Sequence, residues 1–136
     1  MPIHWKPNGG SWTNTGPNGF GELYDSDSCM AHKGHFLNSL LNDNNGQKIV
    51  YEDICTLYSG SFQNGVMEGN FDVTVITQQD WEMVTSIHGN QVASGTKKQV
   101  VYSAGNVVSE SGSVDVQLNV FYGRDESKCF NSLSIV

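Results

Sequence analysis

Long hydrophobic runs and basic residues are both scarce in this sequence. Nowhere do its 136 residues approach the roughly 18 consecutive apolar residues that a membrane span needs. The sequence also lacks a basic segment followed by an apolar one, which is the pattern of a secretory signal. Only seven residues are Lys or Arg, and Arg124 is the single arginine, so a binder that tracks nucleic-acid phosphates is excluded. We therefore expect a cytoplasmic protein with no membrane span and no nucleic-acid partner.

Closely spaced cysteines are also missing. The three cysteines, Cys29, Cys55 and Cys129, form no Cys-x-x-Cys motif. This spacing excludes zinc ribbons and thioredoxin-like redox motifs. Reduced thiols are the simplest interpretation, and one disulfide with a third, free cysteine is the alternative.

Charge is sparse and mostly negative. Charged residues make up 15% of the chain, and 14 Asp and Glu against seven Lys and Arg give a net charge of −7. Polarity comes instead from 15 glycines and from many Asn and Ser residues, which favour turns and short strands over helices. Hydrophobic residues, at 38%, are numerous enough to form a core.

Alternation of apolar and polar residues predicts most of the secondary structure. Residues 70–77 and 114–122 alternate cleanly, and runs rich in β-formers occupy 47–58 and 98–102. Residues 81–87 also alternate and are predicted to form a strand. Seven or more short strands separated by turns indicate an all-β fold.

Three short segments admit other interpretations. Residues 34–41 (GHFLNSLL) are the best helix candidate, but the run is short and an Asn-rich loop follows it. The segment Asn42–Gly46 resembles a calcium loop, yet Leu41 would take the first ligand position, so an ordinary turn is favoured. His32 and His35 would face opposite ways on a strand, and no third ligand lies near them in sequence. We expect no metal site and no cofactor, with these histidines exposed.

A five-residue pattern, Gly-x-aromatic-x-Asn, recurs along the chain. It covers residues 10–14 (GSWTN), 34–38 (GHFLN) and 60–64 (GSFQN), so the aromatic returns after 24 and 26 residues. In a β-hairpin the Asn supplies a turn with positive φ, and the glycine allows close approach of the next hairpin. One hairpin cannot bury its aromatic alone, so we expect the aromatics of stacked copies to form one core stripe.

This pattern resembles MORN repeats, in which Tyr-x-Gly-x-Trp/Phe-x-Asn-Gly precedes further glycines. The best copies are residues 58–69 (YSGSFQNGVMEG) and 10–24 (GSWTNTGPNGFGELY), and residues 102–112 look like a variant from bacterial antitoxin-like repeat proteins. The resemblance implies stacked antiparallel hairpins that serve as interaction modules. A single β domain, 1–136, would then contain units at about 10–33, 34–57, 58–81 and 82–112, with C-terminal strands at 113–136 that could close a sandwich or barrel.

Patterns for catalysis are missing. The chain has no Gly-x-Ser-x-Gly nucleophile elbow and no phosphate-binding loop, and its carboxylates cannot be paired by separation. Cys29 could meet His32 or His35 in space, but nothing in the sequence supports that pair. We therefore expect no catalytic residue and favour a protein that is not an enzyme.

The function expected from these observations is non-catalytic binding, most directly to another protein. A small acidic inhibitor or immunity-type protein with a basic partner is one concrete form. Two alternatives stay open, a lectin-like glycan-binding protein and a small β-barrel enzyme or ligand carrier. An exposed edge strand would also allow a homodimer. The candidate binding residues are aromatic side chains that can contact a protein or a sugar, namely Trp5, Trp12, Tyr24, Tyr58 and Trp81.

Overall fold

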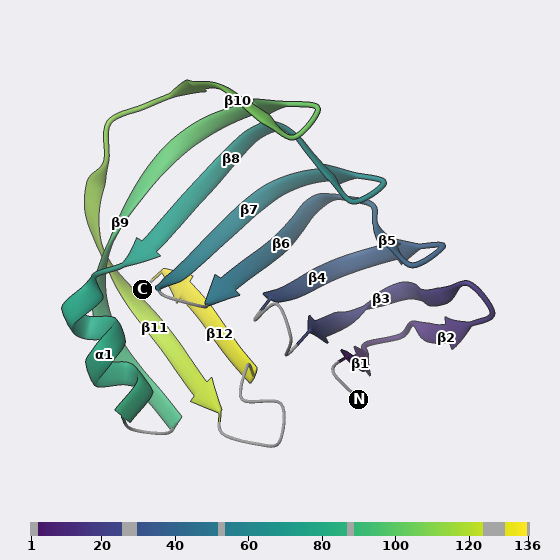
Figure 1. The fold of residues 1–136 in the computed structure, drawn as a ribbon, viewed down its shortest axis with the longest axis horizontal. Coiled ribbons are helices and arrows are strands. Elements are labelled where there is room, and N and C mark those ends of the chain that lie inside the picture. Colours follow the sequence, from purple (N-terminus) through teal and green to yellow (C-terminus); the bar gives the residue numbers. More distant parts are fainter. Residues whose placement is uncertain (1–2, 26–29, 52–53, 87–88, 124–129, 136) are drawn as a thin grey trace.

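A twelve-stranded antiparallel sheet dominates the structure (Figure 1). The computed structural model describes residues 3–25, 30–51, 54–86, 89–123 and 130–135, and the predicted all-β class is confirmed. The elements are β1 (Ile3–Pro7), β2 (Ser11–Thr13), β3 (Gly16–Asp25), β4 (Met30–Leu37), β5 (Leu40–Leu41), β6 (Asp43–Tyr51), β7 (Cys55–Gln63), β8 (Val66–Ile76), α1 (Gln78–Ser86), β9 (Gly89–Ser103), β10 (Asn106–Glu110), β11 (Val114–Gly123) and β12 (Phe130–Ile135). Cys29 and Cys129 lie outside the described residues.

The sheet is open. Its neighbours run β1–β3–β4–β6–β7–β8–β9–β11–β12, while β2, β5 and β10 pair with β3, β4 and β9. In Figure 1 the strands form an arc from β1 at lower right, over β8, to β11 at lower left. No pairing within the described residues joins β1 to β12, so the C-terminal strands do not close a barrel there.

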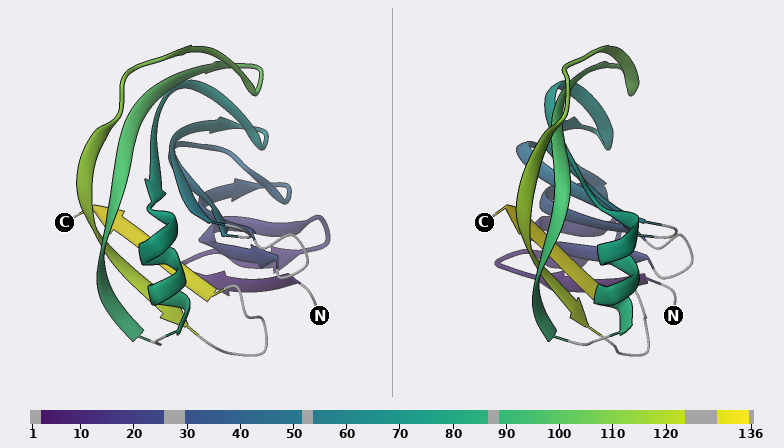
Figure 2. Two further views of the ribbon diagram at one scale, coloured as in Figure 1. Left: turned by 60° about the vertical axis from the view of Figure 1, so that its left-hand side comes forward. Right: turned by 90° about the vertical axis from the view of Figure 1, so that its left-hand side faces the viewer.

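The predicted strand at 81–87 is wrong, because residues 78–86 form the helix α1. Thr77 caps it, since the backbone N–H of Asp80 donates to Thr77 Oγ1 at 3.3 Å. Trp81 and Val84 lie three residues apart, so both point from one side of the helix into the core. Figure 2 shows α1 against the end of the sheet formed by β9 and β11. In the described part of the chain, no helix has the length and apolar character needed to cross a membrane.

Residues 34–46 contain no helix, and residues 42–46 form no simple turn. They complete β4, form β5 and begin β6. The pairing of β4 passes from β6 to β5 with an interruption at Gly34 and His35, and the Asp43 carboxylate lies at this gap. Its Oδ2 accepts from the backbone N–H of His35 at 2.8 Å, and its Oδ1 accepts from Asn45 N–H at 2.9 Å. The Asn-rich segment therefore forms part of a bulged strand, which periodicity alone does not predict.

The two faces of the sheet carry separate cores. On the face that α1 contacts, called the first face, buried residues of neighbouring strands form one cluster with Trp81 and Val84 of the helix. This first core consists of Tyr24, Ala31, Ile49, Cys55, Leu57, Ile76, Trp81, Val84, Ala93, Leu118 and Val120. On the second face the buried cluster is Phe36, Leu41, Phe62, Phe71, Val73, Val100 and Tyr102.

Glycines make room for the aromatic rings of this second core. A Cβ on Gly60 would lie 2.8 Å from the Phe71 ring, and one on Gly46 would lie 2.9 Å from the Phe62 ring. The rings pack edge to face, with centroids 5.3 Å apart for Phe62 and Phe71 and 5.2 Å for Phe71 and Tyr102. The high glycine content thus follows in part from aromatic rings that lie directly on the backbone of neighbouring strands.

Candidate functional site

The structure distributes the five predicted binding aromatics over both cores and one edge. Tyr24 and Trp81 are only 4% and 6% exposed and belong to the first core, so the expectation that they are exposed is wrong. Trp12 is 59% exposed on β2. The expected core stripe therefore includes Phe36 and Phe62 but not Trp12.

Trp5 and Tyr58 are half-buried against the second core. The Trp5 ring covers Gly21 and packs edge to face on Phe36, with centroids 5.2 Å apart. The Lys48 ammonium lies 5.8 Å from the centroid of the Tyr58 ring. These contacts explain both rings as core packing, and a binding role for them stays a prediction.

Groups capable of binding a metal ion are not assembled in the described part of the chain. No cluster of three His, Cys, Asp or Glu side chains occurs there. His32 and His35 lie on opposite faces of β4, and His32 is largely buried instead of exposed. Burial also raises the pKa of the Cys55 thiol to about 12, so this buried cysteine is a poor nucleophile at neutral pH.

Four hairpin turns stack side by side along one margin of the sheet. Three of them are two-residue turns with both residues at positive φ, namely Asn38–Ser39, Asn64–Gly65 and Ala104–Gly105. Backbone hydrogen bonds link turns that are distant in sequence. Ser39 N–H donates to Pro17 at 2.9 Å, Gly65 N–H to Leu41 at 2.7 Å, and Gly105 N–H to Met67 at 3.0 Å.

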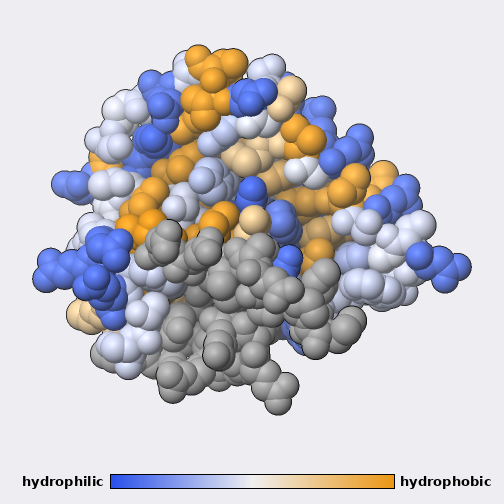
Figure 3. All heavy atoms as spheres, viewed as in Figure 1, coloured by the Kyte–Doolittle hydropathy of each residue, from blue (hydrophilic) through white to orange (hydrophobic). Residues whose placement is uncertain are grey.

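This margin is apolar and exposed. We call its exposed hydrophobic residues the turn ridge; they are Trp12 (59% exposed), Leu37 (43%), Leu40 (47%), Val66 (42%) and Val107 (52%). In Figure 3 hydrophobic patches alternate with hydrophilic ones over these turns, at the upper right. The patches are neighbours in space, because Leu40 borders Gly65 and Val66 borders Gly105.

A second exposed feature crosses the first face. We call it the polar row. It consists of directly opposed residues on six successive strands from β3 to β9, namely Glu22, Lys33, Gln47, Ser59, Asp72 and Gln99. Each of these residues is half-buried or exposed. The next row along the strands, from Tyr24 to Thr74, is buried, so the polar row marks where the first core ends.

The polar row is hollowed at its β7–β9 end. A pocket of about 340 Å³, called here the central pocket, is lined by Asn44, Asn45, Ser59, Gly60, Asn70, Phe71, Asp72 and Gln99. Ser59 faces Asp72 and Asp72 faces Gln99 across neighbouring strands. The lining combines carboxamide, hydroxyl and carboxylate side chains, and no basic residue contributes to it.

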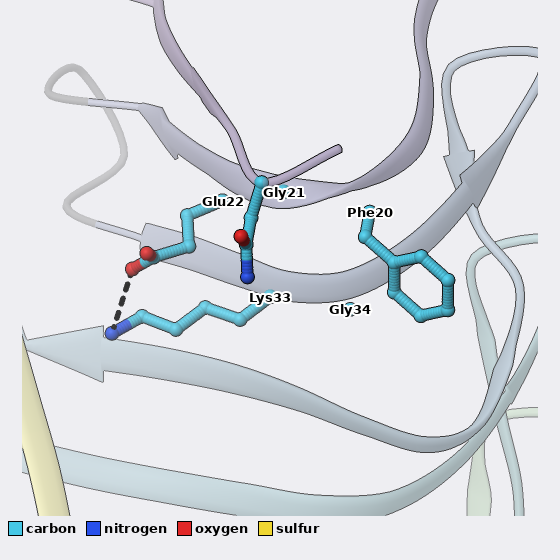
Figure 4. Close-up of a pocket in the computed structure, with 6 residues that line it drawn as sticks. Phe20, Gly21, Glu22, Lys33 and Gly34 are labelled. Atoms are coloured by element: carbon cyan, nitrogen blue, oxygen red, sulfur yellow. Dashed lines mark ion pairs between the residues drawn. The ribbon is translucent and has the colours of Figure 1, made fainter. Parts of the chain in front are cut away.

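A second pocket, of about 330 Å³, lies at the β3–β4 end of the row. Figure 4 shows Glu22 and Lys33 pointing toward one another at one end of it and Phe20 at the other. The Lys33 Nζ is 3.2 Å from Glu22 Oε1. Burial favours a higher pKa for Glu22, but the hydrogen bond from Tyr24 and the charge of Lys33 outweigh it and lower that pKa. The Phe20 ring, 54% exposed, packs on His35 with centroids 4.9 Å apart.

Reasoning from the sequence missed both features for one reason. The ridge and the row join residues from different hairpins, so their composition depends on register. Irregularities at Asp43–Gly46 and Gly60–Phe62 shift the register between neighbouring strands, which hides the register from the sequence. The turn dipeptides at 38–39 and 64–65 were a usable signal, since Leu37 and Leu40 flank the first and Val66 follows the second.

No family model, no curated protein and no solved structure matches this chain. The resemblance to MORN repeats therefore stays a prediction, and the functional interpretation depends on the geometry described above.

Proposed function

We propose that this chain is a non-catalytic binding module that engages a protein partner through the turn ridge. The observation that carries the proposal is the recurrence of exposed apolar side chains at four stacked turns. An exposed apolar patch with polar residues around it is typical of a surface that binds another protein.

The construction of the ridge supports a binding role. Hydrogen bonds between the turns hold its backbone, so a partner would meet a surface that is already ordered. Ala104 adds to this order, because its backbone N–H donates to Glu68 Oε2 at 2.7 Å. A preorganised surface loses less entropy on binding than a flexible one.

The charge around the ridge favours a basic partner. Among the described residues of the segments 12–16, 37–41, 63–68 and 103–110, Glu68 and Glu110 are the ionisable side chains, and both are acidic. Glu110 is paired with Lys98, whose Nζ lies 2.7 Å from its Oε1, so Glu68 is the acidic group of these segments that forms no ion pair within the described residues. The whole chain carries a net charge of −7. The complementary surface is an apolar segment flanked by Lys or Arg, which fits an inhibitor or immunity-type protein with a basic partner.

The test compares two double variants, each of which carries two Val→Ser substitutions. Val66→Ser/Val107→Ser removes two ridge residues, and Val92→Ser/Val114→Ser removes two valines that are 60% and 57% exposed elsewhere on the sheet. Proteins captured from the native source by the wild-type chain are identified, purified and titrated against both variants by calorimetry. Each Val→Ser change removes apolar surface that the partner would bury, so we expect Kd to rise by about 10-fold or more for the ridge variant alone.

Unfolding curves of both variants control for loss of structure. Equal affinity of the two variants for the purified partner would contradict the proposal. So would a partner whose binding surface carries an acidic patch.

A further inference from the structure

We propose that the central pocket and the polar row bind a neutral carbohydrate. This site is separate from the turn ridge, and it is a second function rather than a refinement of the first. The hydrogen-bonding groups that the pocket presents, and those that it lacks, select this ligand.

The polar side chains of the central pocket are not engaged with one another. Within the described residues, no hydrogen bond is formed by the side chains of Asn44, Asn45, Ser59, Asn70, Asp72 or Gln99. A carboxamide offers two donors and one acceptor, a hydroxyl offers both, and a carboxylate only accepts. The pocket therefore presents donors and acceptors side by side on a backbone that the sheet holds in place.

Each competing small ligand lacks a matching group. An anion would meet Asp72 and no basic side chain in the lining. A metal ion would find Asp72 as the single carboxylate. An apolar ligand would find little exposed hydrophobic surface, since Phe71 is 1% exposed and the other lining side chains are polar. Hydroxyl groups of a neutral sugar each donate one hydrogen bond and accept another, which fits adjacent amide and carboxylate groups.

The row continues beyond the central pocket and ends at an aromatic ring. From β3 to β9 it crosses five gaps between strands, or about 24 Å. Phe20 lies on the same side of β3 as Glu22 and lines the second pocket. An exposed aromatic ring can stack on the apolar face of a sugar. The arrangement fits a linear oligosaccharide that lies across the strands, with one end at Gln99 and the other at Phe20.

The experiment uses the full chain and four neutral sugar series, built on cellobiose, maltose, lactose and N,N′-diacetylchitobiose. Each series is titrated by two-dimensional amide NMR. We expect one series to shift the backbone amides of Ser59, Asp72 and Gln99. Longer members of that series should bind more tightly, and Phe20→Ala should weaken the long members more than the disaccharide.

Matched variants locate the site. Asp72→Ala/Gln99→Ala removes two groups of the row, and Asp115→Ala/Gln117→Ala removes the same two residue types from exposed positions on β11. We expect about a 10-fold loss of sugar affinity for the first pair and none for the second, since losing a hydrogen bond to a charged group costs about one such factor or more. The ridge variant Val66→Ser/Val107→Ser should bind sugar as the wild type does.

Four outcomes would overturn the proposal. They are no amide shift with any neutral sugar, shifts that map away from the polar row, full sugar affinity in Asp72→Ala/Gln99→Ala, or shifts of the row amides with a peptide or a sugar phosphate instead. The proposed function would survive all four, because its own test uses the turn ridge and a protein partner.

Discussion

Several positions in this sheet require glycine because an aromatic ring lies directly on the backbone there. Gly60 is the clearest case, because an added Cβ would lie 2.7 Å from the Asn70 carbonyl oxygen and 2.8 Å from the Phe71 ring. Its backbone φ is not positive, so space alone decides the effect of a substitution there. We therefore predict that Gly60→Ala lowers the free energy of unfolding by about 1–3 kcal/mol, as overpacking of a core does.

The matched control is Gly112→Ala, at a position where a Cβ would meet nothing within 4 Å. Alanine there restricts the unfolded chain and leaves the folded one unstrained, so we expect no loss of stability. Urea unfolding of both variants measures the difference. Equal stabilities would contradict the packing account of the glycines.

His32 gives the stability a dependence on pH. Burial, helped by the charge of Lys48 and opposed by that of Asp25, lowers the pKa of His32 from 6.5 to about 4. The folded state therefore resists protonation, whereas the unfolded state takes up a proton below about pH 6.5. Stability is complete above pH 6.5 and is lost as the pH falls toward 4, by about 3 kcal/mol in total from this residue.

The measurement is the free energy of unfolding of wild type and His32→Leu at pH 7 and pH 4.5. The wild type should lose more stability than the variant over this interval. An identical pH dependence of the two proteins would show that His32 is not the group responsible.

At the scale of elements, the side chains of α1 that face the sheet stabilise the helix in its position. Val84 is fully buried against the first core, whereas Met83, its neighbour in sequence, is 46% exposed. We predict that Val84→Ala lowers the free energy of unfolding by about 2 kcal/mol through the cavity it leaves. Met83→Ala should change it little, because alanine is a good helix former and no core contact is lost.

Thermal or urea unfolding of these two variants checks the orientation of the helix. Were Met83→Ala the more destabilising of the two, α1 would face the sheet with its other side.

Sequence patterns found the strands and the turns but not the helix. Clean alternation placed strands at 70–77 and 114–122, where one or both faces are buried. The same alternation in 81–87 misled, because Trp81, Met83 and Thr85 match a strand period by chance. The helix signal was Thr77 three residues before Asp80, a pattern typical of an N-cap.

Two of the three aromatic residues predicted to form the core stripe lie in the second core. Phe36 and Phe62 lie two residues before their turns and are buried, and Tyr102 holds the same place before Ala104–Gly105. Trp12 also precedes a turn, but β2 is three residues long and pairs with β3 alone. Trp5 from β1 instead fills the space over Gly21, which no pattern within one hairpin could indicate.

At the scale of the whole molecule, the net charge of −7 acts on association rather than on the fold. A basic partner would be attracted from a distance, and salt would screen that attraction. We predict that the affinity of the partner falls as sodium chloride is raised, mainly through a slower association rate. Surface plasmon resonance at several salt concentrations measures this, and salt-independent association would argue against a basic partner.

The most direct test of the turn ridge as the binding surface is hydrogen–deuterium exchange of the chain alone and in complex with its purified partner. The account predicts slower exchange in the complex at the turns 37–40, 64–67 and 104–108, which lie together only in the folded sheet. Exchange that slows on α1 or along the polar row, with the turns unchanged, would contradict it.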